Sequence, residues 1–362
     1  GLARGVGAAD QVGAEVIAGS AHGLAGQRSR IVKGLTRGIA AITIGCALTT
    51  VHVADVNLRL GGPWTTGSNL HKGMEKFAEI VGTESGGRIR LKVFPDSQLG
   101  DIQQLLTGVQ LGTVDMAYLA IGNAAQLKGG GPLNVAYVPH LFDSKRKATE
   151  TLNGPIFTPM YETVAQSAGV RIFAVYGARS PRGVQTVKGP VRRPEDLKGM
   201  RIRIPPIDML RATFEAAGAK PVPMGLSDVY MALSRGNLDG QENGFDLAIS
   251  FKWYEVAKYW TATDHVFEVA AWYINERRWR SLTPEDRELF RRAARAGGQV
   301  ATDLGEALDR DAIDTLNKAG VTYVVPDATA FNAVWADVHK AYEGKVWPAG
   351  LVERIRAAQK QP

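Results

Sequence analysis

From residue 56 onward, short alternating or apolar runs are interspersed with stretches in which apolar residues recur at helical spacing. The short runs predict strands at 56–60, 88–94 and 114–121. Between them, the helical spacing predicts one helix at 69–83 and another that begins after Asp101 and ends at Gly112. This order of strands and helices is typical of an α/β fold, in which helices cover a parallel sheet.

The same plan returns in the second half of the chain. Strands are expected at 170–176 and 200–204, followed by a helix at 207–217. A further helix is expected to be capped by Ser227 and to end at Gly236. Because no flexible linker separates the two halves, the repetition predicts two similar lobes joined by short crossings at a hinge.

The C-terminal third is predicted to be more helical. Thr283 is followed by a proline and two acidic residues, which is a typical helix start, and the helical pattern continues to about residue 318. A strand is expected at 321–325. Asp327 then caps a last helical section.

The N-terminal 54 residues do not share this pattern. Residues 1–27 are an extension rich in glycine and alanine. Residues 28–54 resemble a secretory signal, with a nearly uncharged stretch at 38–53 before Asp55. Its basic start is formed by Arg28, Arg30, Lys33 and Arg37. The alternatives are an uncleaved membrane anchor and a lipid anchor at Cys46, the only cysteine. A signal sequence predicts export to the periplasm.

The basic character of the whole chain comes partly from this leader. Residues 1–54 carry five basic and two acidic side chains, so the net charge falls from +7 to +4 without them. The arginine-rich stretches at 277–280 and 291–295 are interleaved with acidic residues. This mixture is typical of a solvated helix face and argues against a nucleic-acid partner.

The sequence offers no catalytic motif. It has no nucleophile elbow, no phosphate-binding loop and no zinc-binding His-Glu-x-x-His pattern. The four histidines after residue 54 are scattered without metal-ligand spacing, which predicts neither a metal nor a cofactor; they are His71, His140, His265 and His339.

Two arginines near strand ends of the second half are candidates for ligand binding. Arg203 lies in an apolar strand, where a charge costs desolvation unless it is paired. Arg182 follows the strand that ends near residue 176. The carboxyl ends of such strands border the ligand crevice of open α/β sheets, and a guanidinium can hold a carboxylate with two hydrogen bonds. The alternative is an internal ion pair with Glu195, Asp196 or Asp228.

Five motifs, taken together in order and spacing, give the chain a specific resemblance. They are 94–100 (FPDSQLG), 109–117 (VQLGTVDMA), 194–205 (PEDLKGMRIRIP), 226–233 (LSDVYMAL) and 236–243 (GNLDGQEN). The chain resembles the solute-binding proteins of tripartite ATP-independent periplasmic (TRAP) transporters over essentially all of residues 55–345.

The resemblance implies an α/β, two-lobe periplasmic binding protein of type II-like architecture. Each lobe would have a central sheet flanked by helices, the ligand would lie in the cleft between lobes, and a long helix would occupy the C-terminal half. Lobe I is expected to comprise 55–179 and about 269–312. Lobe II is expected to comprise 180–268 and about 313–362.

The resemblance also implies a ligand site. Arg203 matches the family's dominant ligand contact, and Arg182 matches a second arginine, with Arg179 as its competitor. The remaining expected ligand-binding residues are Asn243, Pro205, Leu226, Trp64, Ser68 and Phe245, and Tyr118 is a further expected wall residue. Ala120 stands where sialic-acid-binding members carry a glutamate, so sialate is not expected.

The implied function is capture of a small organic acid and its delivery to the membrane permease subunits of the transporter. The aromatic residues Trp64, Tyr118 and Phe245 favour a small, sparsely hydroxylated carboxylate over a sugar acid. Two alternatives are an α/β enzyme acting on carboxylates and a binding protein that serves a sensor.

Overall fold

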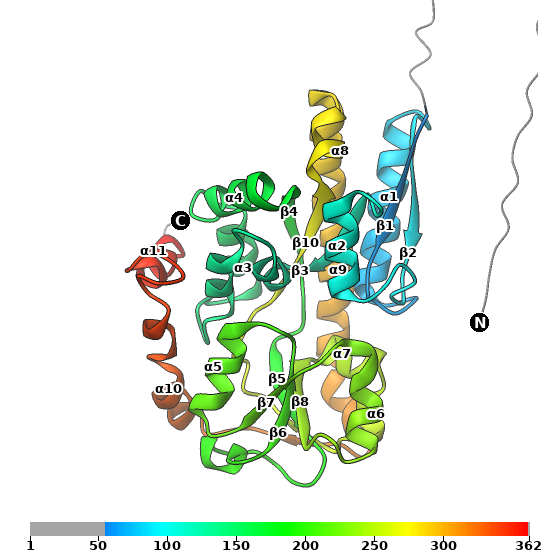
Figure 1. Ribbon diagram of the computed structural model, residues 1–362. Coiled ribbons are helices and arrows are strands. Elements are labelled where there is room, and N and C mark those ends of the chain that lie inside the picture. Colours follow the sequence, from blue (N-terminus) through cyan, green and yellow to red (C-terminus); the bar gives the residue numbers. More distant parts are fainter. Residues whose placement is uncertain (1–54, 361–362) are drawn as a thin grey trace, which may run out of the picture. The chain divides into compact units, whose positions relative to one another are not determined.

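A computed structural model describes residues 55–360; the predicted signal sequence at 28–54 lies outside the described residues. Two mixed β-sheets form the framework (Figure 1). The first sheet has the strand order β2-β1-β3-β10-β4. Its strands are β1 (Val56–Gly61), β2 (Ile89–Phe94), β3 (Met116–Ala120), β4 (Val170–Ala178) and β10 (Val269–Asn275).

The second sheet has the order β11-β9-β5-β8-β6-β7. Its strands are β5 (Arg182–Thr186), β6 (Arg201–Ile204), β7 (Lys220–Pro223), β8 (Gly240–Gly244), β9 (Tyr259–Thr261) and β11 (Thr322–Val324).

The parallel arrangement expected for the strands at 56–60, 88–94 and 114–121 is confirmed, and each sheet also contains one antiparallel strand. In the first sheet β1 is parallel to β2 and β3, but β10 is antiparallel to β3 and β4. In the second, β6 is parallel to β7 and β8, but β5 is antiparallel to β8 and β9. Each of these two strands follows a strand of the other sheet, at the short crossings from β4 to β5 and from β9 to β10.

Helices cover both sheets, and each sheet buries its own aromatic stack. Phe77 lies 4.4 Å from Trp272 on the first sheet, and Phe245 lies 4.2 Å from Trp260 on the second, between ring centroids. No helix within residues 55–360 is both long and apolar enough to cross a membrane. The helices are α1 (Asn69–Glu84), α2 (Ile102–Leu111), α3 (Lys145–Leu152), α4 (Thr158–Ala168), α5 (Asp208–Ala216), α6 (Val229–Ser234), α7 (Phe245–Ser250), α8 (Glu276–Ser281), α9 (Pro284–Lys318), α10 (Ala328–Trp335) and α11 (Leu351–Ala358).

Three of the four predicted side-chain caps are confirmed. Asp101 accepts a hydrogen bond from the backbone of Gln104 at 2.8 Å, and Thr283 and Asp327 cap α9 and α10 in the same way. The predicted Ser227 cap is wrong. Residues Leu226–Asp228 form a 3₁₀ turn, and α6 follows it without a side-chain cap, because the turn already leads the backbone into the helix.

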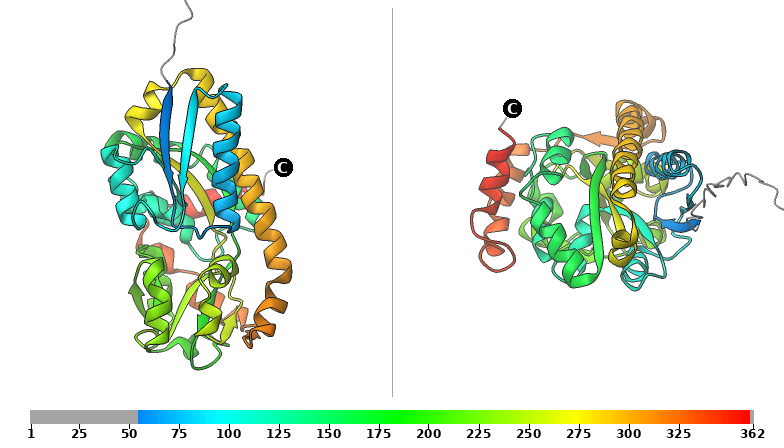
Figure 2. Two further views of the ribbon diagram at one scale, coloured as in Figure 1. Left: turned by 90° about the vertical axis from the view of Figure 1, so that its right-hand side faces the viewer. Right: turned by 90° about the horizontal axis from the view of Figure 1, so that it is seen from above.

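The long helix expected in the C-terminal half is α9, with 35 residues. Figure 2 shows it running beside α1 and on past the second sheet. The two helices approach closely at Gly73 and Gly297. A Cβ at Gly297 would lie 2.5 Å from the carbonyl oxygen of Gly73, so these glycines permit the packing distance.

The C-terminal segment contacts both halves of the structure. The side chain of Tyr342 donates a hydrogen bond to the carbonyl of Asp208, at the start of α5. Beyond it, Gln359 donates to the carbonyl of Leu141 and accepts from the amide of Asp143, both in the half that contains the first sheet. Helix α11, which belongs to the segment of about 313–362 expected in lobe II, lies beside the half that contains the first sheet (Figure 1).

Candidate functional site

Loops at the carboxyl ends of β1, β3, β6 and β8 meet around a small cavity between the two sheets. The space open to the centre of a water molecule is only about 20 Å³, which is room for one or two waters. Its lining consists of Trp64, Ile102, Ala120, Asn123, Arg179, Arg182, Arg203, Pro205, Ile207, Leu226, Asn243, Leu247 and Glu268. Carboxyl ends of parallel strands are where open α/β sheets bind ligands.

Arg179 and Arg182 both form ion pairs with buried acidic residues of the protein itself. The Arg179 side chain bonds Asp246 through Nε at 2.8 Å, contacts Glu268, and donates to the Asn243 side chain at 2.9 Å. Arg182 holds Glu242 with two hydrogen bonds of 2.7 and 2.6 Å and reaches Glu268 at 3.0 Å.

The third arginine, Arg203, differs from these two. It is 1% exposed and forms no ion pair with any acid among the described residues. Its Nε and Nη2 both donate to the carbonyl oxygen of Met224, at 2.9 and 2.6 Å. Its Nη1 is buried and has no hydrogen-bond partner within residues 55–360. The alternative for Arg203 was an internal ion pair. Among the described residues it does not pair with Glu195, Asp196 or Asp228.

The pKa shifts also distinguish Arg203 from Arg179 and Arg182. Burial lowers the pKa of Arg203 to about 10, and attraction by Glu242 offsets only part of this cost. Burial would also lower the pKa of Arg182, but Glu242 and Glu268 raise it above the ordinary arginine range. For Arg179, Asp246 and Glu268 likewise outweigh burial and raise the pKa.

The acids of this network are held ionised by their partners. Burial acts to raise the pKa of Glu268, but Arg182 and Arg179 lower it below the usual value. The pKa of Glu242 is lowered by Arg182 and by a hydrogen bond from His265, against the effect of burial. His265 is fully buried, and this burial lowers its own pKa.

Six of the eight residues expected in the site line the cavity: Arg203, Arg182, Asn243, Pro205, Leu226 and Trp64. Ser68 does not, because it caps α1 by accepting from the amide of His71. Phe245 does not, because its ring is stacked on Trp260 in the second core. Tyr118, the other expected wall residue, is stacked on Trp272.

Both arginines named as competitors, Arg182 and Arg179, reach the cavity, and so does Ala120, the position of the family's sialate-linked glutamate.

Two polar residues at the cavity, Asn123 and Glu268, were not predicted from the sequence. Each is a lone polar side chain in an apolar stretch, at 116–124 and 266–274, and each is buried. That isolation is the signal that could have identified them, since a polar group in a buried run needs a partner or a function.

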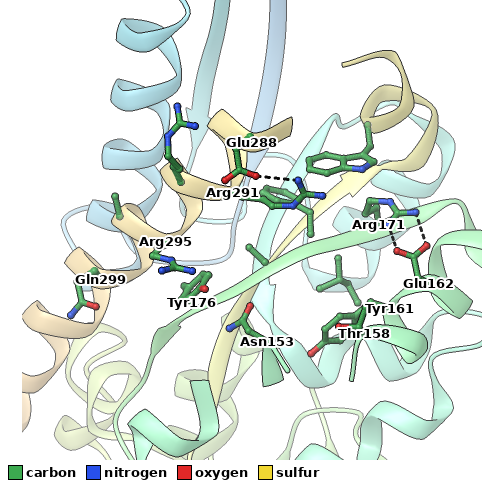
Figure 3. Close-up of a pocket in the computed structure, with 16 residues that line it drawn as sticks. Asn153, Thr158, Tyr161, Glu162, Arg171, Tyr176, Glu288, Arg291, Arg295 and Gln299 are labelled. Carbon is green, nitrogen blue, oxygen red and sulfur yellow. Dashed lines mark hydrogen bonds and ion pairs between the residues drawn. The ribbon is translucent and has the colours of Figure 1, made fainter. Parts of the chain in front are cut away.

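A larger hollow lies elsewhere, in the groove between α4 and α9 whose floor is β4 (Figure 3). Its volume is about 910 Å³. The wall formed by α9 carries Arg291, Arg292 and Arg295. These side chains are exposed, and two of them already face acids: Arg291 faces Glu288 at 3.4 Å, and Arg292 faces Glu84 at 2.9 Å.

Two α/β halves whose strand ends enclose buried arginines define a two-lobe binding protein. The chain belongs to the bacterial extracellular solute-binding proteins of family 7, whose sequence profile matches residues 60–345. This confirms the resemblance to TRAP solute-binding proteins. The family consists of binding proteins, so the chain is not an enzyme.

Two curated relatives match most of the chain. It is 31% identical over 287 residues to the 2,3-diketo-L-gulonate-binding periplasmic protein YiaO of Escherichia coli, covering 79% of this chain and 86% of the relative. It is 32% identical over 306 residues to a solute-binding protein of Roseobacter denitrificans, covering 83% and 92%.

Solved structures of TRAP solute-binding proteins have the same fold as this chain. A TRAP solute-binding protein from Roseobacter denitrificans with bound L-galactonate superimposes with a TM-score of 0.77 at 30% identity, covering 83% of this chain and 99% of that one. One from Actinobacillus succinogenes, also with L-galactonate, gives 0.79 at 29% identity, covering 85% and 100%.

Proposed function

We propose that this protein captures a small organic carboxylate in the cavity between its sheets and that Arg203 is the principal ligand contact. The observation that carries this proposal is the buried Nη1 of Arg203, which has no hydrogen-bond partner in the part of the chain that the structure describes. A buried, charged donor left unpaired is costly, and a carboxylate supplies both the missing acceptor and the missing charge. The neighbouring Arg179 and Arg182 act mainly through the acids they hold, fixing the walls of the site.

The cavity is too small to admit an organic acid as it stands, since it has room for one or two waters. We infer that the two lobes separate to load the ligand and close again on it. The chain crosses between the sheets at 179–181 and 262–268, and these short crossings are the proposed hinge, together with α9. Lobe I would comprise 55–178, 269–312 and α11, and lobe II 182–261 and 313–342.

The relatives indicate the ligand class. The proteins compared above are named for, or hold, 2,3-diketo-L-gulonate and L-galactonate, both sugar acids. The cavity offers neutral polar side chains at Asn123 and Asn243, and apolar ones at Ile207 and Leu226. This mixture fits a hydroxy acid. The expectation of a sparsely hydroxylated ligand stays a prediction, and a graded series from simple hydroxy acids to six-carbon aldonates tests it.

We infer the partner and the location from the family. We propose that the signal at 28–54 directs the chain to the periplasm, where the loaded protein delivers its ligand to the permease subunits of a TRAP transporter. The curated relatives at 26–31% identity include proteins named as periplasmic, which supports this location.

The test is calorimetry on protein that has been unfolded and refolded to remove any bound acid. Each acid of the series is compared with its uncharged amide. Binding of an acid together with no binding of its amide supports the carboxylate–arginine proposal, because the amide keeps the shape and loses the charge. Equal affinity for acid and amide would overturn it.

A further inference from the structure

The C-terminal segment brings together three side chains that the ligand site does not use. His339 lies in a 3₁₀ turn (Val338–Ala341), Glu343 follows one helical turn later, and Glu353 comes from α11. We propose that these three residues form a binding site for a divalent transition-metal ion such as Zn²⁺. This inference does not depend on the function proposed above, because the cluster lies outside the cavity lining.

The spacing of the donor atoms suits a metal ion. The Nε2 atom of His339 lies 4.0 Å from Oε1 of Glu343 and 3.9 Å from Oε1 of Glu353, and the donor atoms all lie within 4.8 Å of one another. An ion at the centre of such a triangle is about 2.5 Å from each donor, so contraction by a few tenths of an ångström reaches the Zn²⁺ ligand distances of about 2.0–2.2 Å.

The donors also lack other partners. His339 is 3% exposed, and the buried Nδ1 atom of its ring has no hydrogen-bond partner among the described residues. Its Nε2 atom lies within ion-pair distance of Glu343 and Glu353. Oε1 of Glu343 is also buried and makes no hydrogen bond with any described residue. The separations of 3.9 and 4.0 Å are too long for hydrogen bonds within the cluster. The imidazole Nε2 and the buried carboxylate oxygen of Glu343 face each other across a gap of 4.0 Å, which a metal ion between them would fill.

The chemistry of the donors selects the kind of ion. One imidazole and two carboxylates suit Zn²⁺ and its neighbours better than Ca²⁺ or Mg²⁺, which prefer oxygen alone. The carboxylate of Glu353 is 62% exposed, so an ion can enter from solvent and keep water as a fourth ligand. The sequence alone did not suggest this site, because two donors lie four residues apart but the third comes from the following helix.

An ion here would fasten the turn that contacts α5 to the helix that contacts the first-sheet half. Tyr342, between His339 and Glu343, bonds Asp208, and Gln359 at the end of α11 bonds Leu141. The metal would therefore fix the place where the C-terminal segment crosses from one half to the other.

The experiment uses the purified protein without a histidine tag, stripped with a chelator and titrated with Zn²⁺ in a calorimeter. We expect one ion per chain with micromolar or tighter affinity, weaker binding of Mg²⁺ and Ca²⁺, and a melting temperature raised by several degrees at saturating Zn²⁺. Absence of Zn²⁺ binding by the intact protein would refute the site.

Variants locate the ion. His339→Gln should abolish Zn²⁺ binding, and Glu353→Gln should weaken it at least tenfold. Because Glu353 is largely exposed, that variant should fold normally in the absence of metal. Glu306→Gln removes an exposed carboxylate on α9 and should leave the affinity unchanged. Equal Zn²⁺ affinity in Glu353→Gln and Glu306→Gln would contradict the proposal even if His339→Gln failed to fold.

Discussion

Two arginine-rich regions of this protein invite opposite interpretations. The groove between α4 and α9 is wide and displays Arg291, Arg292 and Arg295 to solvent. The cavity between the sheets has almost no free space, and its three arginines are at most 2% exposed. By size and accessible charge the groove is the more obvious anion site, yet we place the ligand in the cavity.

The difference lies in what each guanidinium can do without a ligand. An exposed arginine is solvated, turns toward a nearby acid or stacks on a ring, as Arg295 does on Tyr176 at 5.4 Å. Arg203 can do none of these, because burial removes water and its neighbours leave Nη1 unpaired. A binding site is therefore better identified by an unsatisfied buried charge than by the number of charges or the volume of a hollow.

The largest effect is expected at Arg182, where charge is buried and fully paired. Arg182→Met leaves Glu242 and Glu268 without their main partner, so the free energy of unfolding should fall by about 3–5 kcal/mol. Chemical denaturation measures this loss. The exposed Arg235→Met is the matched control and should change stability by less than about 0.5 kcal/mol. A loss at Arg182 no larger than that of the control would contradict the role given to this pair network.

Arg203→Met should have the reverse profile. Ligand affinity should fall at least about 100-fold, because a desolvated charge-assisted pair is lost. Stability of the ligand-free protein should not fall, since keeping this unpaired charge buried costs on the order of 3 kcal/mol. Calorimetry and thermal melting of the same preparation give both quantities. Destabilisation as large as that of Arg182→Met would show that Arg203 is a structural residue.

Mild acid should weaken the paired network. The lowered pKa of His265 means that the unfolded chain binds a proton more readily below pH 6.5, so stability is lost as the pH falls from there. Glu242 and Glu268, whose pKa values are also lowered, add a further loss below about pH 4.5.

Melting curves between pH 7.5 and 5.5 measure the first step, which is at most about 1.4 kcal/mol per pH unit. His265→Gln should flatten the curve in this range. A slope unchanged by that substitution would assign the loss to another group.

The smallest effect is expected in the groove. Arg292→Met removes an exposed pair with Glu84, and stability should change by less than about 0.5 kcal/mol. Affinity for the carboxylate should stay within about twofold of the unmodified protein in calorimetry. A tenfold loss of affinity would move the ligand site, or part of it, to the groove.

The features that could be predicted from the sequence are those determined by residues close together in the chain. The caps Asp101, Thr283 and Asp327 lie next to the helices they start, and α1, α2 and α9 follow from apolar spacing. Arg203 stood out because a charge in an apolar strand needs an explanation. The strand β8 did not stand out, because its sequence, Gly-Gln-Glu-Asn-Gly, carries polar residues that only pairing with β5 and β6 buries.

Phe245 and Glu268 were misjudged for non-local reasons, and Ser68 for a local one. Phe245 turns away from the cavity because Trp260, on another strand, offers its ring a stacking partner. Ser68 is used by its own helix, a role that the Ser-x-x-His spacing does not reveal. Glu268 joins the site only because β10 returns from late in the chain to the first sheet, next to β4. Such pairings between distant segments cannot be read from periodicity.

Helix α9 has a mechanical consequence for the protein. Its first half is held tightly on α1 and β4 through the glycine contacts, and its second half reaches α7 and β11. An unbroken helix of 35 residues resists sharp bending in the way a stiff rod does, since a kink would break its backbone hydrogen bonds. Such a rod, clamped at one end, would restrict lobe movement to a gentle flexing with one preferred direction. It would also return the lobes to the same alignment after every cycle, so that ligand release need not compromise the accuracy of the next capture.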